Sequence, residues 1–96
     1  MKHEIKCWPH FFNQTWEGIK LFEYRIDDRN YQTGDEVVLL EYDPLQQKYT
    51  GRFIRGAIVY VLAGSIQDAR QPLPNGYCVF QLDPTRLENG YVTQEK

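Results

Sequence analysis

The stretch Gly18-Ile19-Lys20-Leu21-Phe22-Glu23-Tyr24-Arg25 marks the point where a helical pattern gives way to a strand pattern. A glycine can end a helix in the left-handed conformation that other residues avoid, so Gly18 is expected to close the helix before it. Charges among apolar neighbours are costly to bury unless they are paired. Lys20, Glu23 and Arg25 are therefore expected to mark a rim or a cleft. The alternative is a weak ion pair between Glu23 and Arg25 on the solvent face of a strand.

The register of this strand provides a geometric test. In a regular strand Lys20 lies on the same face as Phe22, and Glu23 lies on the opposite face. If Lys20 and Glu23 act on one ligand, the strand must begin after Lys20 or carry a β-bulge there.

The residues before this stretch predict a short strand and an amphipathic helix. Alternation over His3–Cys7 indicates a strand with one buried face, and Pro9 suits the first turn of a helix. The helix carries one apolar stripe at helical spacing, formed by Trp8, Phe11, Phe12, Thr15, Trp16 and Ile19. Such a stripe predicts burial in the core, and Trp8 is the expected exception because it lies at the helix entrance.

The residues after the stretch predict three more strands, at Glu36–Tyr42, Gly51–Leu62 and Tyr77–Leu82. Segment 63–76 is expected to form a long loop that could act as a lid, and residues 88–96 a poorly ordered polar tail. The order is strand, helix and four strands (β-α-β-β-β-β), and several strands are apolar on both faces. This pattern predicts a mixed α+β, mainly β fold whose sheet curls into a small barrel, with the helix covering one opening.

Composition limits the classes of function. The 96 residues correspond to one domain, 1–96, with an ordered core of about residues 3–83. The net charge of −2 excludes a protein that is basic overall, so any anion-binding role must be local. No apolar run approaches the ~20 residues of a membrane span, and no signal peptide opens the chain. We therefore expect a cytoplasmic protein without a membrane partner.

The cysteines and the loop acids do not indicate a metal site. Cys7 and Cys78 lack the paired spacing of a zinc or redox motif, and we interpret them as buried thiols, with a disulfide as the alternative. The adjacent Asp27 and Asp28 are assigned to hydrogen bonds within a loop. No metal site and no cofactor are predicted.

The motif Gly18-x-Lys20-x-x-Glu23-x-Arg25 resembles the signature of the ASCH domain, a branch of the PUA-like superfamily. The resemblance runs from His3 to about Leu82. It includes the blocks His3-x-Ile5-Lys6, Pro9-x-x-Phe12, Asp28-Arg29-x-Tyr31-x-x-Gly34-Asp35, Glu41-Tyr42-Asp43 and Tyr49-Thr50-Gly51-Arg52. These blocks look like a small uncharacterised subfamily of that group, domain of unknown function 3850. The resemblance implies a PUA-like barrel of five or six strands, with a ligand cleft between helix and barrel.

By this resemblance the cleft binds single-stranded RNA or a modified nucleotide, through Gly18, Lys20, Glu23 and Arg25. The chemistry agrees, since cations can contact phosphate or a base edge and a carboxylate can accept hydrogen bonds from an exocyclic amine. Further candidates on the rim are the cations Lys6 and Arg29 and the stacking residues Trp8, Tyr24 and Tyr31.

Two other interpretations remain open. Some ASCH-like proteins are small amidohydrolases acting on an acylated cytidine, and they carry a threonine where Glu23 stands here. A hydrolase or nuclease acting on a modified nucleoside or RNA would use Lys20 and Glu23 as its acid/base pair. A protein-interaction domain is the third interpretation, and a large exposed apolar patch away from the motif would favour it. The ligand's identity and the oligomeric state are not predicted.

Overall fold

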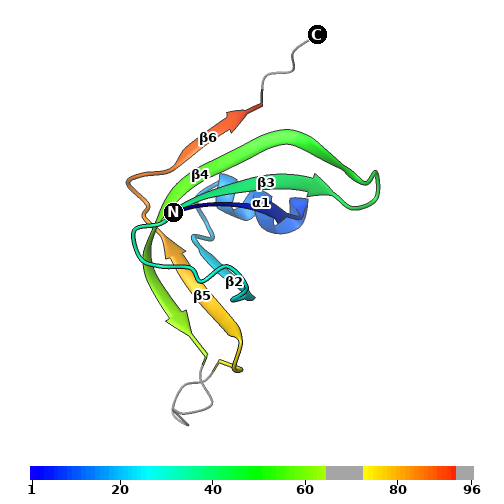
Figure 1. Cartoon of the computed structure of the whole chain (residues 1–96). Helices are drawn as coiled ribbons and strands as arrows, with labels where there is room; N and C mark the ends of the chain where they lie inside the picture. Colours follow the sequence, from blue (N-terminus) through cyan, green and yellow to red (C-terminus); the bar gives the residue numbers. More distant parts are fainter. Residues whose placement is uncertain (65–72, 93–96) are drawn as a thin grey trace.

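The computed structural model describes residues 1–64 and 73–92, which contain one helix and six strands (Figure 1). The elements in chain order are β1 (Lys2–Cys7), α1 (Pro9–Trp16), β2 (Phe22–Ile26), β3 (Glu36–Asp43), β4 (Lys48–Ala63), β5 (Tyr77–Leu82) and β6 (Glu88–Tyr91). The mainly β composition and the single helix are those that the sequence predicts. With eight residues, α1 is far shorter than a membrane span, and no helix in the described ranges is long and apolar enough to cross a membrane.

The six strands form one sheet in the order β1-β3-β4-β5-β2, and β6 pairs with β4 beside this path. The β1–β3 pairing is parallel, whereas every other pairing is antiparallel. The long strand β4 curves through the molecule, so that its first half pairs with β3 and β6 and its second half with β5 (Figure 1). A register shift between Ile58 and Tyr60 marks a bulge or irregularity in the pairing with β5.

The sheet is not closed into a barrel, so the expectation of a closed barrel is not confirmed. Strands β1 and β2 are the two ends of the strand path, and no ladder joins them in the described ranges. Two arginines span this gap: Arg25 Nη2 donates to the main-chain oxygen of Lys6, and Arg29 Nη1 donates to that of Glu4 at 2.7 Å. Alternation of apolar residues determines which face of a strand is buried, but it does not determine whether the two sheet edges meet.

A buried apolar cluster joins the helix to the sheet. Phe12 and Thr15 are the buried residues of α1, and Phe12 belongs to the cluster. Other large members come from β3, β4 and β5 (Leu39, Ile54, Ile58, Phe80 and Leu82), together with Ile5 of β1 and Tyr31. The predicted core stripe is confirmed at Phe12 and Thr15. It is wrong at Phe11 and Ile19, which are 49% and 75% exposed. Ile19 is exposed because the helix ends at Trp16 and Ile19 lies beyond it. Phe11 lies within the helix but is not covered by the sheet, and Trp16 is only partly buried.

An internal ion pair connects α1 to the sheet. Arg52 on β4 donates to both carboxylate oxygens of Glu41 on β3, with Nε–Oε1 at 2.8 Å and Nη2–Oε2 at 2.9 Å. Arg52 Nη2 also donates to Asn13 Oδ1 on α1, and its guanidinium carbon lies 4.8 Å from the centroid of the Trp16 ring. The hydrogen bonds from Arg52 hold the pKa of Glu41 below its usual range. Three elements are thus held together around one buried carboxylate.

Strand β6 corrects the expectation of a poorly ordered tail at 88–96. Its four residues pair with Arg52–Arg55 of β4, and Gly90 lies flat against Phe53, because a Cβ there would come 2.6 Å from the ring. The strand is held by backbone hydrogen bonds and by the close packing of Gly90, which has no side chain. Neither leaves a hydrophobic pattern in the sequence, which explains why the strand is not predicted. Residues 93–96, and residues 65–72 of the expected loop, lie outside the described residues.

Candidate functional site

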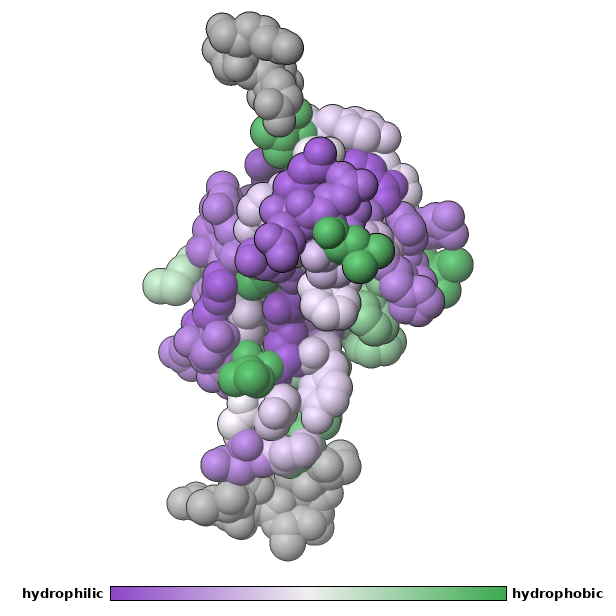
Figure 2. All heavy atoms as spheres, turned by 90° about the vertical axis from the view of Figure 1, so that its right-hand side faces the viewer, coloured by the Kyte–Doolittle hydropathy of each residue, from purple (hydrophilic) through white to green (hydrophobic). Residues whose placement is uncertain are grey.

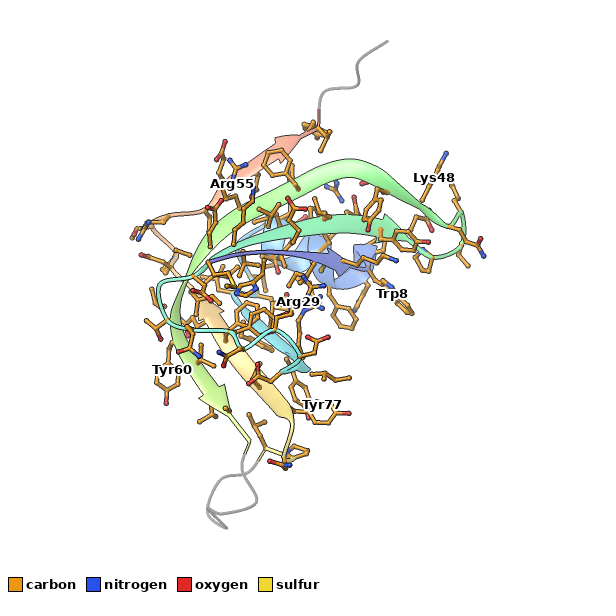
Figure 3. All side chains as sticks on the ribbon, viewed as in Figure 1. Trp8, Arg29, Lys48, Arg55, Tyr60 and Tyr77 are labelled. Carbon is orange, nitrogen blue, oxygen red and sulfur yellow. The ribbon has the colours of Figure 1, made fainter. Side chains whose placement is uncertain are left out.

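A cleft of about 740 Å³ opens between α1, the free edge of β1 and strand β2. Eight of the nine residues predicted to bind a ligand line it: Lys6, Trp8, Lys20, Glu23, Tyr24, Arg25, Arg29 and Tyr31. The cleft coincides with the gap in the sheet, and Figure 3 shows Arg29 between β1 and β2 and Trp8 beyond the end of β1. Lys20, Glu23 and Arg25 of the motif are therefore gathered at the gap between β1 and β2.

Glu23 is the most buried charged residue of the cleft, with 5% of its surface exposed. Its Oε2 accepts a hydrogen bond from Lys20 Nζ at 2.7 Å, and its Oε1 accepts one from Arg25 Nε at 3.1 Å. A buried carboxylate is tolerated when opposite charges pair with it in this way. We call Lys20, Glu23 and Arg25 the charged cluster.

The register of β2 explains how the charged cluster forms. The strand begins at Phe22, after Lys20, so the geometric condition set by the sequence is met. Between helix and strand the chain turns at Gly18, whose φ is +80°, and the main-chain N–H groups of Ile19 and Lys20 both donate to Gln14 O. This turn leaves the side chain of Lys20 free to reach Glu23. Gly18 does not line the cleft, and the feature that it contributes is the left-handed conformation at the helix end.

Exposed aromatic rings flank the charged cluster. Trp8 and Phe11 from the helix side are 56% and 49% exposed, and Phe22 and Tyr24 from β2 are 51% and 53% exposed. All four line the cleft. The sequence points to Trp8 and Tyr24, whereas Phe11 is assigned to the core there because its spacing matches the apolar stripe.

Tyr31 does not have the predicted role of a stacking residue. It is only 3% exposed, and its ring centroid lies 4.7 Å from that of His3 and 4.8 Å from that of Phe80. Both neighbours belong to the interior, so the ring has no open face for a base. Tyr31 is better described as a buried residue of the cleft lining.

The cysteines are free and buried, as predicted. Cys7 lines the cleft, where burial in the first place, and the Glu23 carboxylate in the second, raise the pKa of its thiol to about 12. Burial also raises the pKa of Cys78, to about 11. A thiol with so high a pKa stays protonated near neutral pH, so neither cysteine is an activated nucleophile.

Further residues line the cleft that the sequence alone does not assign to the site: Cys7, Phe11, Gln14, Phe22, Ile26 and Asp28. The sequence gives no signal for Phe22 and Ile26, because alternation with Glu23 and Arg25 predicts that the apolar side chains are the buried ones. In the structure Phe22 and Ile26 are 51% and 58% exposed, and Glu23 is the buried residue. In the described ranges no group of three or more His, Cys, Asp or Glu side chains is arranged to hold a metal ion.

The charge of the cleft differs from that of the chain. Its lining holds four cationic side chains (Lys6, Lys20, Arg25 and Arg29) and two anionic ones (Glu23 and Asp28), a net charge of +2. The other residues of the sequence include seven Lys or Arg and eleven Asp or Glu, so the chain as a whole is at −2. The cleft is therefore a local positive site on an acidic protein.

Fold and cleft together define a small, mainly β domain with an open six-stranded sheet and a positively charged cleft at its gap. The model of the family described as domain of unknown function DUF3850 matches residues 2–82, and the chain belongs to this family. An uncharacterised 12.9 kDa protein in the GpA 3′ region of Escherichia phage P2 is 39% identical over 59 residues, which are 62% of this chain and 52% of the phage protein. The match thus spans about half the length of that relative.

Proposed function

We propose that the domain is a binding module whose cleft takes a segment of single-stranded RNA or a modified nucleotide. The observation that carries this proposal is the net charge of +2 in the cleft of a chain whose net charge is −2. Such a local concentration of cations attracts an anionic ligand to one place, although the rest of the surface repels it. The family's description and the relative's name state no activity, so the proposal rests on the cleft.

The exposed aromatic rings support a ligand that contains bases. Rings that are about half exposed on both sides of a charged cleft can stack on unpaired bases, whatever the base, because every base has a π-face. The volume of about 740 Å³ also lies within the range of roughly 300–1,000 Å³ typical of sites for small ligands. One or a few nucleotides fit this cleft better than a long strand that follows an extended basic surface.

The face of the molecule drawn in Figure 2 does not favour a partner protein. On the face drawn in Figure 2, apolar residues (green) are scattered among hydrophilic ones (purple) and do not merge into one large patch. Several of the exposed aromatic residues line the cleft itself. A protein-docking surface would be expected to show a contiguous apolar patch of several hundred Å².

The family resemblance extends the proposal to the fold. The motif from Gly18 to Arg25 and its flanking blocks support a place for this family among the ASCH domains, with the open sheet as a PUA-like barrel that lacks one seam. Two free thiols suit a reducing compartment, so a cytoplasmic location belongs to the same proposal.

Intrinsic tryptophan fluorescence tests the function directly. Trp8 lines the cleft and Trp16 does not, so a bound base should change the emission of Trp8. We expect saturable binding of a short single-stranded RNA to the wild type, and loss of that binding in Lys20→Ala. Single-stranded DNA, cytidine and N4-acetylcytidine complete the panel, and chromatography of the mixtures detects any product.

Arg55→Ala is the matched control, because Arg55 forms exposed ion pairs with Glu36 and Glu88 outside the cleft. It should bind as the wild type does. Absence of binding across the panel would overturn the proposal. Turnover of a nucleoside or of RNA would assign the domain to the hydrolases, with Lys20 and Glu23 as the acid/base pair.

A further inference from the structure

We infer that Lys20 and Arg25 form a phosphate-binding site, and that Glu23 is a positioning residue which holds these two cations and does not read a base. The inference rests on the proposed function and makes it more specific, since it requires a ligand that carries a phosphate group. That group can be the terminal phosphate of a free nucleotide or a phosphodiester within a strand.

The position of Glu23 is the first step. Each of its carboxylate oxygens already accepts a hydrogen bond from a cation, and its side chain is 7% exposed. The side chains of Lys20 and Arg25 are more exposed, at 13% and 26%. A ligand that enters the cleft therefore meets the nitrogen atoms of the cluster before it meets the carboxylate.

The remaining hydrogen-bond donors are the second step. A lysine ammonium has three N–H groups, and one of those of Lys20 is used by Glu23. An arginine guanidinium has five, and Arg25 uses one for Glu23 Oε1 and one for Lys6 O. Two donors on Lys20 and three on Arg25 are thus left for a ligand, and the cluster has a net charge of +1.

The chemistry of these donors selects the ligand group. A cytosine or adenine amine would face N–H groups of the same polarity, which is unfavourable. The acceptor atoms of a base edge are neutral, whereas a phosphate group is negatively charged, and hydrogen bonds between two charged groups are the strong ones. Arg25 is also held at two points, by Glu23 and by the edge of β1, so little side-chain freedom remains to be lost on binding.

The aromatic rings then have a separate task. With the phosphate on the charged cluster, the base is left to the exposed rings of Trp8, Phe11, Phe22 and Tyr24. Stacking on such rings tolerates every base. The arrangement therefore implies a ligand recognised by its phosphate and its stacking surface, with weak selection among bases.

The first experiment compares ligands with and without a phosphate group. Wild-type protein is titrated with cytidine, cytidine 5′-monophosphate, the dinucleotide CpC and inorganic phosphate as a competitor. We expect at least one phosphate-bearing nucleotide to bind about tenfold or more tightly than cytidine, the size expected for charge-assisted hydrogen bonds. Tighter binding of the monophosphate indicates a terminal phosphate. Tighter binding of CpC indicates a phosphodiester only if inorganic phosphate competes with it, because the second base of CpC can also add stacking.

The outcomes separate this inference from the function on which it rests. If cytidine binds as tightly as both phosphate-bearing ligands, the phosphate site is wrong while nucleotide binding stands. If no member of the panel binds, both proposals are overturned together.

The second experiment tests the role of Glu23 by the pattern of base selectivity. Glu23→Gln is titrated with the monophosphates of adenosine, cytidine, guanosine and uridine. A positioning residue should change all four affinities by the same factor. Selective loss for the adenosine, cytidine and guanosine nucleotides, whose bases carry exocyclic amines, with the uridine nucleotide unaffected, would show that Glu23 reads the base and would overturn the inference.

Lys20→Ala keeps the test decisive if Glu23→Gln does not fold. We expect this variant to lose most of the difference in affinity between cytidine and its monophosphate. The slope of log K against log salt for monophosphate binding should also become shallower by about 1. An unchanged difference in a folded Lys20→Ala protein would contradict the phosphate site. Arg55→Ala is again the control that should leave both quantities unchanged.

Discussion

At the scale of single residues, Glu23 shows how a small domain keeps a charge in its interior. Its carboxylate is bound by Lys20 on one oxygen and by Arg25 on the other. Lys20 and Arg25 would repel each other, and they can lie close together because the negative carboxylate of Glu23 lies between them. Glu23 therefore matters for the geometry of the cleft and also for the stability of the fold.

Replacing Glu23 by alanine should destabilise the protein by about 1–3 kcal/mol, because two partly buried cations are left without their acceptor. Lys20→Ala should cost less, since Glu23 then keeps its hydrogen bond from Arg25. Urea denaturation of the two variants beside the wild type measures both free energies of unfolding. A loss in Lys20→Ala equal to or greater than that in Glu23→Ala would contradict this account.

At the scale of elements, the packing of α1 depends on polar contacts as well as on the core. Arg52 lies against the rings of Phe12 and Trp16, with its guanidinium carbon 5.0 Å and 4.8 Å from their centroids, and it also binds Glu41. Asn13 on the same helix face accepts a further hydrogen bond from Arg52. The eight-residue helix is too short to be stable alone, so these contacts with β3 and β4 determine where it lies. Its position in turn sets one wall of the cleft.

The link between α1 and the sheet should depend on pH. Hydrogen bonds from Arg52, and to a smaller extent from Thr50, lower the pKa of Glu41 below its ordinary value of 4.5. The unfolded chain then binds a proton more readily than the folded one, so stability falls as the pH falls. The contribution of Glu41 is complete above the unfolded-state pKa and is lost as the pH drops through the lower folded-state pKa.

We therefore expect Glu41→Gln to lower the melting temperature near neutral pH and to flatten its decline between about pH 5 and pH 3. Some decline should remain, because the hydrogen bond with His3 lowers the pKa of Asp35 as well. Melting curves across this range check the expectation. Glu88→Gln, which removes an exposed carboxylate paired with Arg55, is the control, and a decline as steep in Glu41→Gln as in this control would disprove the role of Glu41.

At the scale of the whole molecule, the gap between β1 and β2 produces the candidate site. The two strands are far apart in the order of the sheet, and the side chains of Arg25 and Arg29 bridge their free edges. The central parts of β3, β4 and β5 have a neighbouring strand on both sides, whereas the residues at this gap face an open cleft. Function is thus proposed at the gap between the two ends of the strand path.

The charge distribution of the whole molecule predicts a weak salt dependence of RNA binding. Only Lys20 and Arg25 are assigned to phosphate, and single strands lose affinity with a slope of about −0.7 per neutralised phosphate in a plot of log K against log salt. We expect a slope of about −1 to −2 for a short single-stranded RNA, measured by titration between about 50 and 200 mM salt. A slope several times steeper would indicate an extended basic surface, which the net charge of −2 does not offer.

The sequence predicts individual elements better than their closure. Alternation identifies β1, β3, β4 and β5 within a few residues, and Gly18 marks the end of α1 by its need for a positive φ. Strand β6 is missed because Gly90 packs with no side chain, and Phe11 is misassigned because one helical stripe can include both a core face and the edge of a cleft. Each error occurs where a distant segment decides whether a residue is covered.

The sequence by itself determined the mainly β fold with one helix and the presence of Lys20, Glu23 and Arg25 in one short stretch. These features follow from local periodicity, from turn chemistry and from the cost of burying an unpaired charge, all of which act over a few residues. Only the tertiary structure decided that the sheet stays open between β1 and β2, that Glu23 is enclosed by both cations, and that Tyr31 is buried while Phe11 and Phe22 face the cleft. The reason is that exposure and ion pairing depend on segments brought together from distant parts of the chain, and a local sequence pattern does not say which segments these are.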